Sequence, residues 1–229
     1  MKTWAHHLTR FYKDLPAPAK LPPGVELLHP HLQPGVMELA AAFFEKYYGD
    51  NNSRKIIMGI NPGRFGAGIT GINFTAPRQL HNNCGIAHAL GDSSELSAEF
   101  IYEMIDACGG PVKFYRNYFI SAVSPLGFTQ AGKNLNYYDS RKLEKAVTPF
   151  INSCLERQFS FGFDTDACYC IGEDKNFKFL NRLNETRRQQ GLVSFDTIIS
   201  LPHPRFIMQY RRKEKQRYID LYVKILCCL

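Results

Sequence analysis

Four short apolar runs alternate along the chain with segments of helical composition, and this alternation constrains the fold more than any other feature. The predicted strands cover residues 54–60, 117–123, 166–171 and 195–201, and the predicted helices cover residues 36–48, 95–108, 140–157, 174–190 and 209–226. Strands that alternate with helices build a parallel sheet with helices on both faces. The sequence therefore predicts an α/β fold with three layers (α/β/α) around a central four-stranded parallel sheet.

The length of 229 residues predicts one domain. Between residues 13 and 35 the chain is rich in proline, which fixes φ and removes backbone donors. We therefore expect residues 1–35 to form a proline-rich N-terminal arm ahead of the first predicted helix.

Seven cysteines without a CxxC pair favour reduced, buried thiols over a metal or disulfide role. The first residues lack the apolar core of a signal peptide, and no run approaches the ~18 apolar residues of a membrane span. We expect a cytoplasmic monomer that binds no membrane, metal or cofactor.

The basic excess of the chain is concentrated near its C-terminus. Of a formal net charge of +7, residues 205–217 hold six basic residues against one acidic residue. A basic face is typical of proteins that bind the phosphate backbone of nucleic acids. A solvated helix face in a mildly basic protein is the alternative interpretation.

A glycine-rich loop follows the first predicted strand. It starts at Asn61-Pro62-Gly63, continues through further glycines and ends at Phe74. Open α/β sheets bind ligands at the carboxyl ends of their strands, and glycine lets the backbone approach a ligand closely. An amide, a backbone cradle and an aromatic ring together can hold a flat heterocycle.

Polar residues also follow the other predicted strands, and His203 after the last strand is the most informative. Asn61 alone could cap a turn, and His203 between two prolines could be structural. Because both lie at strand ends of one sheet, we interpret them as opposite walls of one cleft.

Several other kinds of site fit the sequence poorly. Residues 66–71 match GxGxxG, but residues 61–65 separate them from the strand, and Asp92 follows a loop where a dinucleotide site needs a strand. The glycines lack the Lys-Ser/Thr of a phosphate-binding P-loop. There is no GxSxG motif, and the adjacent Glu173 and Asp174 are better suited to capping a helix than to forming a catalytic pair.

Residues 59–74, GINPGRFGAGITGINF, resemble the first active-site motif of the uracil-DNA glycosylase superfamily, closest to its single-strand-selective monofunctional (SMUG) branch. The shared positions are Gly59, Asn61, Pro62, Gly63, Phe65, Gly66, Thr70, Gly71 and Phe74. The second motif of the family begins with His-Pro and continues to an Arg, and it resembles His203-Pro204-Arg205. The family usually inserts Ser-Pro between the His-Pro and the Arg, and this chain lacks that insertion. The resemblance covers roughly residues 36–226 and indicates a divergent, bacterial-type SMUG subgroup.

One position departs from the family pattern. Residues 119–126 align with the motif that normally carries a base-reading Asn, and Ala122 occupies that place. Ser121 or Ser124 could substitute, because a hydroxyl donates and accepts hydrogen bonds. A hydroxyl makes fewer fixed contacts than an amide, so base selectivity would be looser.

The resemblance implies a DNA-repair glycosylase that flips uracil or oxidised uracil, such as 5-hydroxymethyluracil, out of DNA and hydrolyses its N-glycosidic bond. It implies that Asn61 orients the water and that His203 stabilises the departing base. The residues expected to contact the base are Gly59, Ile60, Pro62, Gly63, Phe65, Phe74, Ser121 and Ser124. Those expected to contact DNA are Arg64, Arg205, Phe206, Ile207, Arg211, Arg212, Lys213 and Arg217, with Phe206 or Ile207 as a wedge.

Two functions of other classes remain open at this point. A non-catalytic nucleic-acid-binding protein would keep the basic segment but would not need Asn61 and His203 at facing strand ends. A nucleoside or nucleotide hydrolase on the same sheet would act on free nucleosides.

Overall fold

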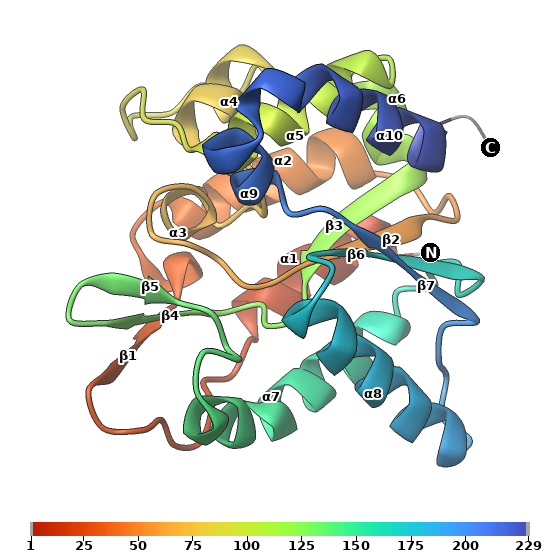
Figure 1. Cartoon of the computed structure of the whole chain (residues 1–229). Helices are drawn as coiled ribbons and strands as arrows, with labels where there is room; N and C mark the ends of the chain where they lie inside the picture. The colour runs from red at the N-terminus through yellow and green to blue at the C-terminus, as the bar shows by residue number, and fades with distance from the viewer. Residues whose placement is uncertain (1, 228–229) are drawn as a thin grey trace.

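A four-stranded parallel sheet forms the centre of the molecule in the computed structural model, which describes residues 2–227 (Figure 1). The spatial order is β3-β2-β6-β7, with bounds β2 (Lys55–Gly59), β3 (Tyr118–Ala122), β6 (Ala167–Ile171) and β7 (Thr197–Leu201). In the register, Ile57 lies opposite both Ile120 and Tyr169. The predicted α/β fold and all four predicted strands are confirmed, with bounds that differ by at most two residues.

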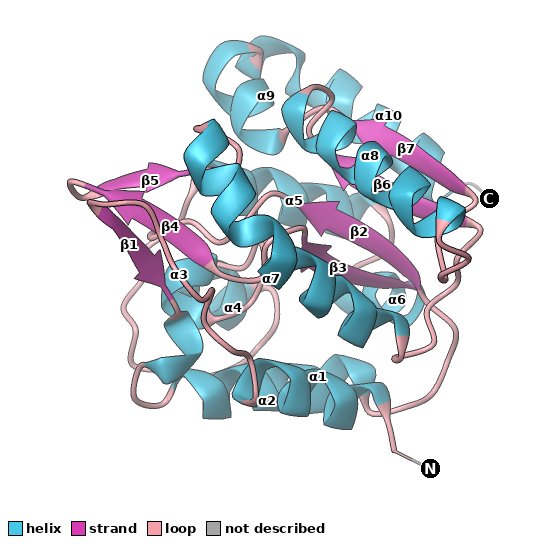
Figure 2. Cartoon of the chain, turned by 90° about the horizontal axis from the view of Figure 1, so that it is seen from below, coloured by secondary structure: helices cyan, strands magenta, loops and turns pink. Residues whose placement is uncertain are grey.

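Helices cover both faces of this sheet (Figures 1 and 2). On one face lie α7 (Arg141–Phe159) and α8 (Lys175–Gln189), and on the other lie α5 (Leu96–Ala107) and α10 (Lys215–Cys227). Further helices are α2 (Val36–Tyr48), α6 (Pro111–Asn117), α9 (Pro204–Tyr210) and the short α3 (Ala67–Thr70) and α4 (Pro77–Asn82). The three predicted layers are therefore present.

The N-terminal segment begins with a helix that the sequence analysis did not expect, α1 (Trp4–Lys13). The Thr3 hydroxyl caps it by accepting a hydrogen bond from the His6 backbone N–H. Its apolar face packs beside α2, and the Trp4 ring lies 5.9 Å from the ring of Phe119 on β3. Residues 14–35 then carry only a short strand, β1 (Val25–Leu28), and a single 3-10 turn, η1 (Pro30–Leu32).

A second, three-stranded antiparallel sheet was also not predicted. Strand β1 pairs with β4 (Gly127–Gln130), and β4 forms a hairpin with β5 (Lys133–Leu135). Its turn uses two residues with positive φ, Ala131 and Gly132. The strands are only three or four residues long, so their apolar alternation is too short to identify.

The last predicted helix, residues 209–226, is corrected to two helices. Pro204 opens α9 at its first turn, where proline needs no hydrogen-bond donor, and α9 ends at Tyr210. A 3-10 turn, η2 (Arg212–Glu214), connects it to α10. The basic segment is therefore bent between two helices.

The expectation of reduced thiols is wrong for two of the cysteines. Cys108, at the end of α5, and Cys227, in the last turn of α10, form a disulfide. Their sequence separation of 119 residues gave no local signal of pairing. Four other cysteines, Cys84, Cys154, Cys168 and Cys170, are free and buried, as expected.

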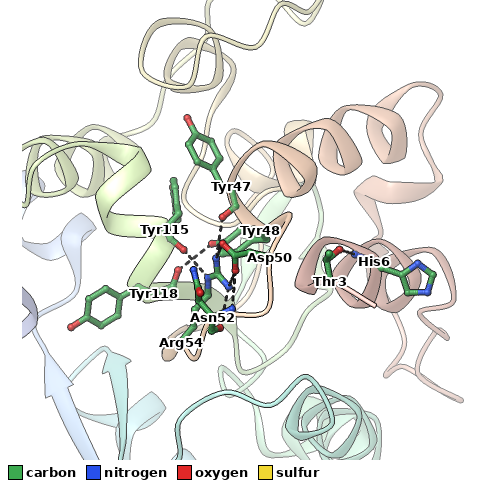
Figure 3. Close-up of polar contacts among 9 residues, drawn as sticks. All are labelled: Thr3, His6, Tyr47, Tyr48, Asp50, Asn52, Arg54, Tyr115 and Tyr118. Atoms are coloured by element: carbon green, nitrogen blue, oxygen red, sulfur yellow. Dashed lines mark hydrogen bonds and ion pairs between the residues drawn. The ribbon is translucent and has the colours of Figure 1, made fainter. Parts of the chain in front are cut away.

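A fully buried arginine fixes the start of β2, at the end of the sheet opposite the polar strand ends (Figure 3). The Arg54 guanidinium donates to the carbonyls of Tyr115 (2.8 Å) and Tyr47 (3.2 Å) and to both oxygens of the Asp50 carboxylate. Burial alone would raise the pKa of Asp50, but hydrogen bonds from Arg54 and from the Asn52 N–H lower it below its usual range. Arg54 thus ties α2, α6 and the sheet together.

Among the residues that the structure describes, no helix combines the length and the apolar character needed to cross a membrane.

Candidate active site

A cleft of about 840 Å³ opens at the carboxyl ends of the parallel strands. The arrowheads of β2 and β3 point to the side of the molecule where the small sheet lies (Figure 2). The cleft is bordered by the loop after β2, the end of β3, the loop after β5, the start of α8, and the first turns of α5 and α9. Asn61, Phe74 and His203, from segments far apart in the sequence, border it together.

The Asn61 carboxamide is held in one orientation by the segment that follows β5. Its Nδ2 donates to the carbonyl of Leu135 (3.1 Å), and its Oδ1 accepts from the backbone N–H of Tyr137 (3.0 Å). A carboxamide oxygen has two lone pairs, so one lone pair of Oδ1 remains. The side chain is partly exposed to the cleft, where that lone pair can accept a hydrogen bond from a water molecule.

His203 is held as a neutral imidazole. Burial, and then repulsion by the nearby Arg205, lowers its pKa from the ordinary 6.5 to about 4. Its Nδ1 accepts a hydrogen bond from the backbone N–H of Arg205 (3.1 Å), so Nδ1 carries no proton. The proton of the neutral ring must therefore be on Nε2, which makes that nitrogen a hydrogen-bond donor.

The Phe74 ring packs closely against Gly59, the last residue of β2, because Gly59 has no side chain. A Cβ on Gly59 would stand 2.6 Å from Cε2 of the ring. Phe74 itself has a positive φ of 53°, which is rare for a residue other than glycine. Its ring centroid lies 6.3 Å from that of His203, so an aromatic face and a ring N–H donor are neighbours.

The glycine-rich loop after β2 is held by an internal hydrogen bond and by a hydrogen bond to the β4–β5 hairpin. The Gly68 N–H donates to the Gly63 carbonyl (2.8 Å), and the Arg64 N–H donates to Oδ1 of Asn134, the residue before Leu135 (3.1 Å). A Cβ on Gly68 would stand 2.6 Å from the Gly63 oxygen, so the turn requires glycine there. The other predicted base contacts, Ile60, Pro62, Gly63 and Phe65, also border the cleft.

The two predicted serines do not fill the place left by Ala122. Both hydroxyls are fully buried: Ser121 donates to the Gln158 side chain and Ser124 to the carbonyl of Leu126, and neither residue borders the cleft. Ala122 itself does border it. Sequence alignment placed the serines beside the right strand end but could not show which way their side chains point.

Asn176 is a polar residue of the cleft that the sequence analysis missed. It lies in the first turn of α8, donates to the Ile171 carbonyl (3.0 Å) and accepts from the Tyr137 hydroxyl (2.8 Å). Tyr137 therefore links Asn176 to Asn61, because its own N–H holds the Asn61 amide. Glu95, at the N-terminus of α5, was also missed, since the sequence marked it only as the first residue of a predicted helix.

The predicted DNA contacts divide into three groups. Arg205 and Phe206 border the cleft, and Phe206 is 44% exposed. The remaining basic residues, Arg64, Arg211, Arg212, Lys213 and Arg217, are exposed. Ile207 is 0% exposed and belongs to the core, so the expectation that it could act as a wedge is wrong. Tyr210, 65% exposed and one helical turn after Phe206, borders the cleft in addition.

Comparison with known proteins agrees with this geometry. The model of the family described as the uracil DNA glycosylase superfamily matches residues 46–227. The chain belongs to the uracil-DNA glycosylase superfamily. This superfamily member is 46% identical in sequence to Pedobacter heparinus SMUG2, whose wild-type crystal structure is known. The alignment covers 98% of this chain and 97% of that chain, and the two structures superpose with a TM-score of 0.93. A search of curated proteins found no match.

The positions of the two family motifs in the structure agree with the superfamily assignment. Residues 59–74 and 203–205 are separated by about 130 residues of sequence, yet both border the same cleft of this glycosylase-superfamily protein. The SMUG-like resemblance recognised from these motifs is confirmed.

Proposed function

We propose that the protein is a monofunctional DNA glycosylase that removes uracil or an oxidised uracil, such as 5-hydroxymethyluracil, from DNA. The observation that carries this proposal is the pairing of a backbone-anchored Asn61 with a neutral His203 across one cleft. Membership of the superfamily supports it. The SMUG2 similarity supports the same class of reaction.

In the proposed reaction the target base leaves the DNA stack and enters the cleft. The face of the base stacks on Phe74, and the backbone around Gly63 meets its edge. With Ala122 at the usual position of the base-reading amide and with the two serines turned away, the pocket discriminates among pyrimidines less strictly. We therefore expect activity on more than one uracil derivative.

Bond breaking places negative charge on the departing base and positive charge on the sugar. The Nε2–H of His203 donates to a carbonyl of the base and stabilises the negative charge as it develops. The neutral imidazole suits this role because its Nδ1 accepts from the Arg205 N–H, which leaves the ring proton on Nε2 as the donor. Asn61 holds a water molecule on the free lone pair of Oδ1 for addition to C1′.

The DNA strand is proposed to follow the basic residues beside the cleft. Arg205, Arg211, Arg212 and Lys213 are exposed and can pair with phosphates. Phe206 and Tyr210, with Phe65 on the opposite loop, expose aromatic rings on which unpaired bases can stack. Phe206 is the proposed wedge.

The test is cleavage of single- and double-stranded oligonucleotides with one uracil or one 5-hydroxymethyluracil, followed by hot alkali. We expect alkali-labile breaks at the lesion and intact strands before alkali treatment. Intact strands with retained binding would instead indicate a DNA-binding protein without glycosylase chemistry. Release of base from free uridine or deoxyuridine would indicate a nucleoside hydrolase.

A further inference from the structure

Addition of water to the sugar releases a proton, and neither motif residue can accept it. The Asn61 carboxamide is not a base, so it can position the water without deprotonating it. His203 has its only unprotonated nitrogen, Nδ1, occupied by the Arg205 N–H. The proposed glycosylase reaction therefore needs a proton acceptor that the two motifs do not supply.

Glu95 places a carboxyl group in the same cleft, directly over the glycine loop that carries Asn61. A Cβ on Gly66 would stand 2.5 Å from Cδ of Glu95, and a Cβ on Gly63 would stand 4.0 Å from its Oε2. The absence of a side chain at Gly66 leaves the space that the carboxyl group occupies, and Gly63 lies at van der Waals distance from it. Within residues 2–227, no hydrogen bond or ion pair uses the Glu95 carboxylate oxygens, so they are available to a substrate or to water.

The surroundings of Glu95 make it a stronger base than an ordinary carboxylate. Burial raises its pKa from 4.5 to about 7, and the nearby Arg205 opposes the shift without cancelling it. A general base works best when its pKa is close to the working pH. The other charged or titratable groups that border the cleft are Glu99, Tyr138, Glu173, Asp174, Lys175, His203, Arg205 and Tyr210.

The remaining carboxylates of the cleft are less suited to this role. Asp174 is mostly exposed and pairs with Lys178 (2.7 Å). Glu173 is exposed at the end of β6, and Glu99 lies one turn further along α5 than Glu95. Among these carboxylates, Glu95 is the one that packs against the loop following β2.

We propose that Glu95 is a third catalytic residue, which accepts the proton of the attacking water; this rests on the proposed glycosylase function. The bond between C1′ and the base breaks, and its electron pair leaves with the base. A lone pair of the water oxygen forms the new C1′–O bond, the water proton passes to the Glu95 carboxylate, and Glu95 later releases it to solvent.

The decisive experiment measures single-turnover cleavage of a uracil oligonucleotide between pH 5 and 9 for the wild type and for Glu95→Gln. For the wild type we expect the rate to rise about tenfold per pH unit below the Glu95 pKa of about 7 and to level above it. In Glu95→Gln we expect a rate about 10²–10⁴-fold lower and no such rise, because a carboxamide keeps the hydrogen bonds but cannot accept a proton.

Two further variants separate this role from a general effect of charge or packing. Glu99→Gln removes the same charge from the same helix and should keep the wild-type pH profile. Gly66→Ala keeps the Glu95 carboxylate but displaces it, and should lower the rate. Unfolding temperatures and affinity for DNA with an abasic-site analogue show whether each variant is folded and still binds.

Two outcomes are distinguishable. A wild-type rate, or a wild-type pH profile, in a folded Glu95→Gln variant would overturn the role of Glu95 and leave the glycosylase proposal standing. A wild-type protein that binds DNA but cleaves no uracil would contradict the proposed function itself.

Discussion

At the scale of single residues, hydrogen bonds to the backbone fix Asn61 and His203 and so define what each side chain can do. Asn61 donates to Leu135 and accepts from Tyr137, so its amide cannot rotate without losing both bonds. His203 accepts from Arg205 and therefore presents Nε2–H. In the proposed reaction, the Asn61 amide positions the water and the His203 ring N–H donates to the departing base.

We predict that Asn61→Ala and His203→Ala each lower single-turnover cleavage by about 10²–10³-fold, as removal of one preorganised polar group typically does. Binding to uracil-containing DNA should persist, because phosphate contacts supply most of the affinity. Asn152→Ala and His81→Ala change the same residue types at exposed positions and should retain wild-type rates. Wild-type cleavage by both site variants would contradict the assignment.

At the scale of elements, α9 exposes Phe206 and buries the next residue, Ile207, so one helix carries both a surface aromatic ring and a core side chain. We predict that Phe206→Ala slows cleavage more in double-stranded than in single-stranded DNA, since only the duplex must be held open around a flipped base. The measurement is the ratio of single-turnover rates on the two substrates. Equal slowing on both would assign Phe206 to stacking instead of wedging.

The bend at η2 places three exposed basic residues, Arg211, Arg212 and Lys213, between α9 and α10. If all three contact phosphates, replacing them with alanine should reduce the slope of log affinity against log salt by about 2 on single-stranded DNA, at ~0.7 per phosphate contact. Replacing the exposed Lys2, Arg10 and Lys13 at the N-terminus serves as the control for net charge. An unchanged slope in the first variant would move the DNA-binding face elsewhere.

At the scale of the whole molecule, the two ends of the sheet have different roles. The carboxyl ends of the strands carry the cleft, and the start of β2 carries the buried Arg54 cluster (Figure 3). We predict that Arg54→Leu lowers the free energy of unfolding by about 2–5 kcal/mol, because it leaves the buried carbonyls of Tyr47 and Tyr115 without their donor and removes the charge partner of the half-exposed Asp50. Urea unfolding measures this, and Arg116→Leu, at an exposed arginine, is the control. The fraction of Arg54→Leu that is folded should cleave uracil-containing DNA at the wild-type rate, because Arg54 lies away from the cleft.

The disulfide between Cys108 and Cys227 joins α5 to α10 across a loop of 119 residues. Closing a loop of about this length stabilises a folded protein by roughly 4–5 kcal/mol in the chain-entropy model. We therefore predict that a reducing agent lowers the unfolding temperature of the wild type and leaves that of Cys108→Ser unchanged. Equal sensitivity of both proteins to reduction would show that the pairing does not contribute.

The sequence by itself determined the four strands of the central sheet, the main helices between them, and the edge of the sheet at which the site forms. Apolar runs bounded by glycine and polar residues identify strands, because this pattern can be recognised from residues that are neighbours in the sequence. Parallel strands all end at one edge, so Asn61 and His203 could be expected to face one cleft. Helices α2, α5, α7 and α8 were predictable for the same local reason.

Only the tertiary structure decided which side chains enter the cleft and what holds them. Ser121, Ser124 and Ile207 are buried and do not border it, while Asn176 and Glu95 do, and no local pattern distinguishes these placements. The partners of Asn61 lie more than 70 residues further along the chain. Hydrogen bonds, desolvation and disulfides depend on which distant segments meet, and that is settled by packing of the whole chain.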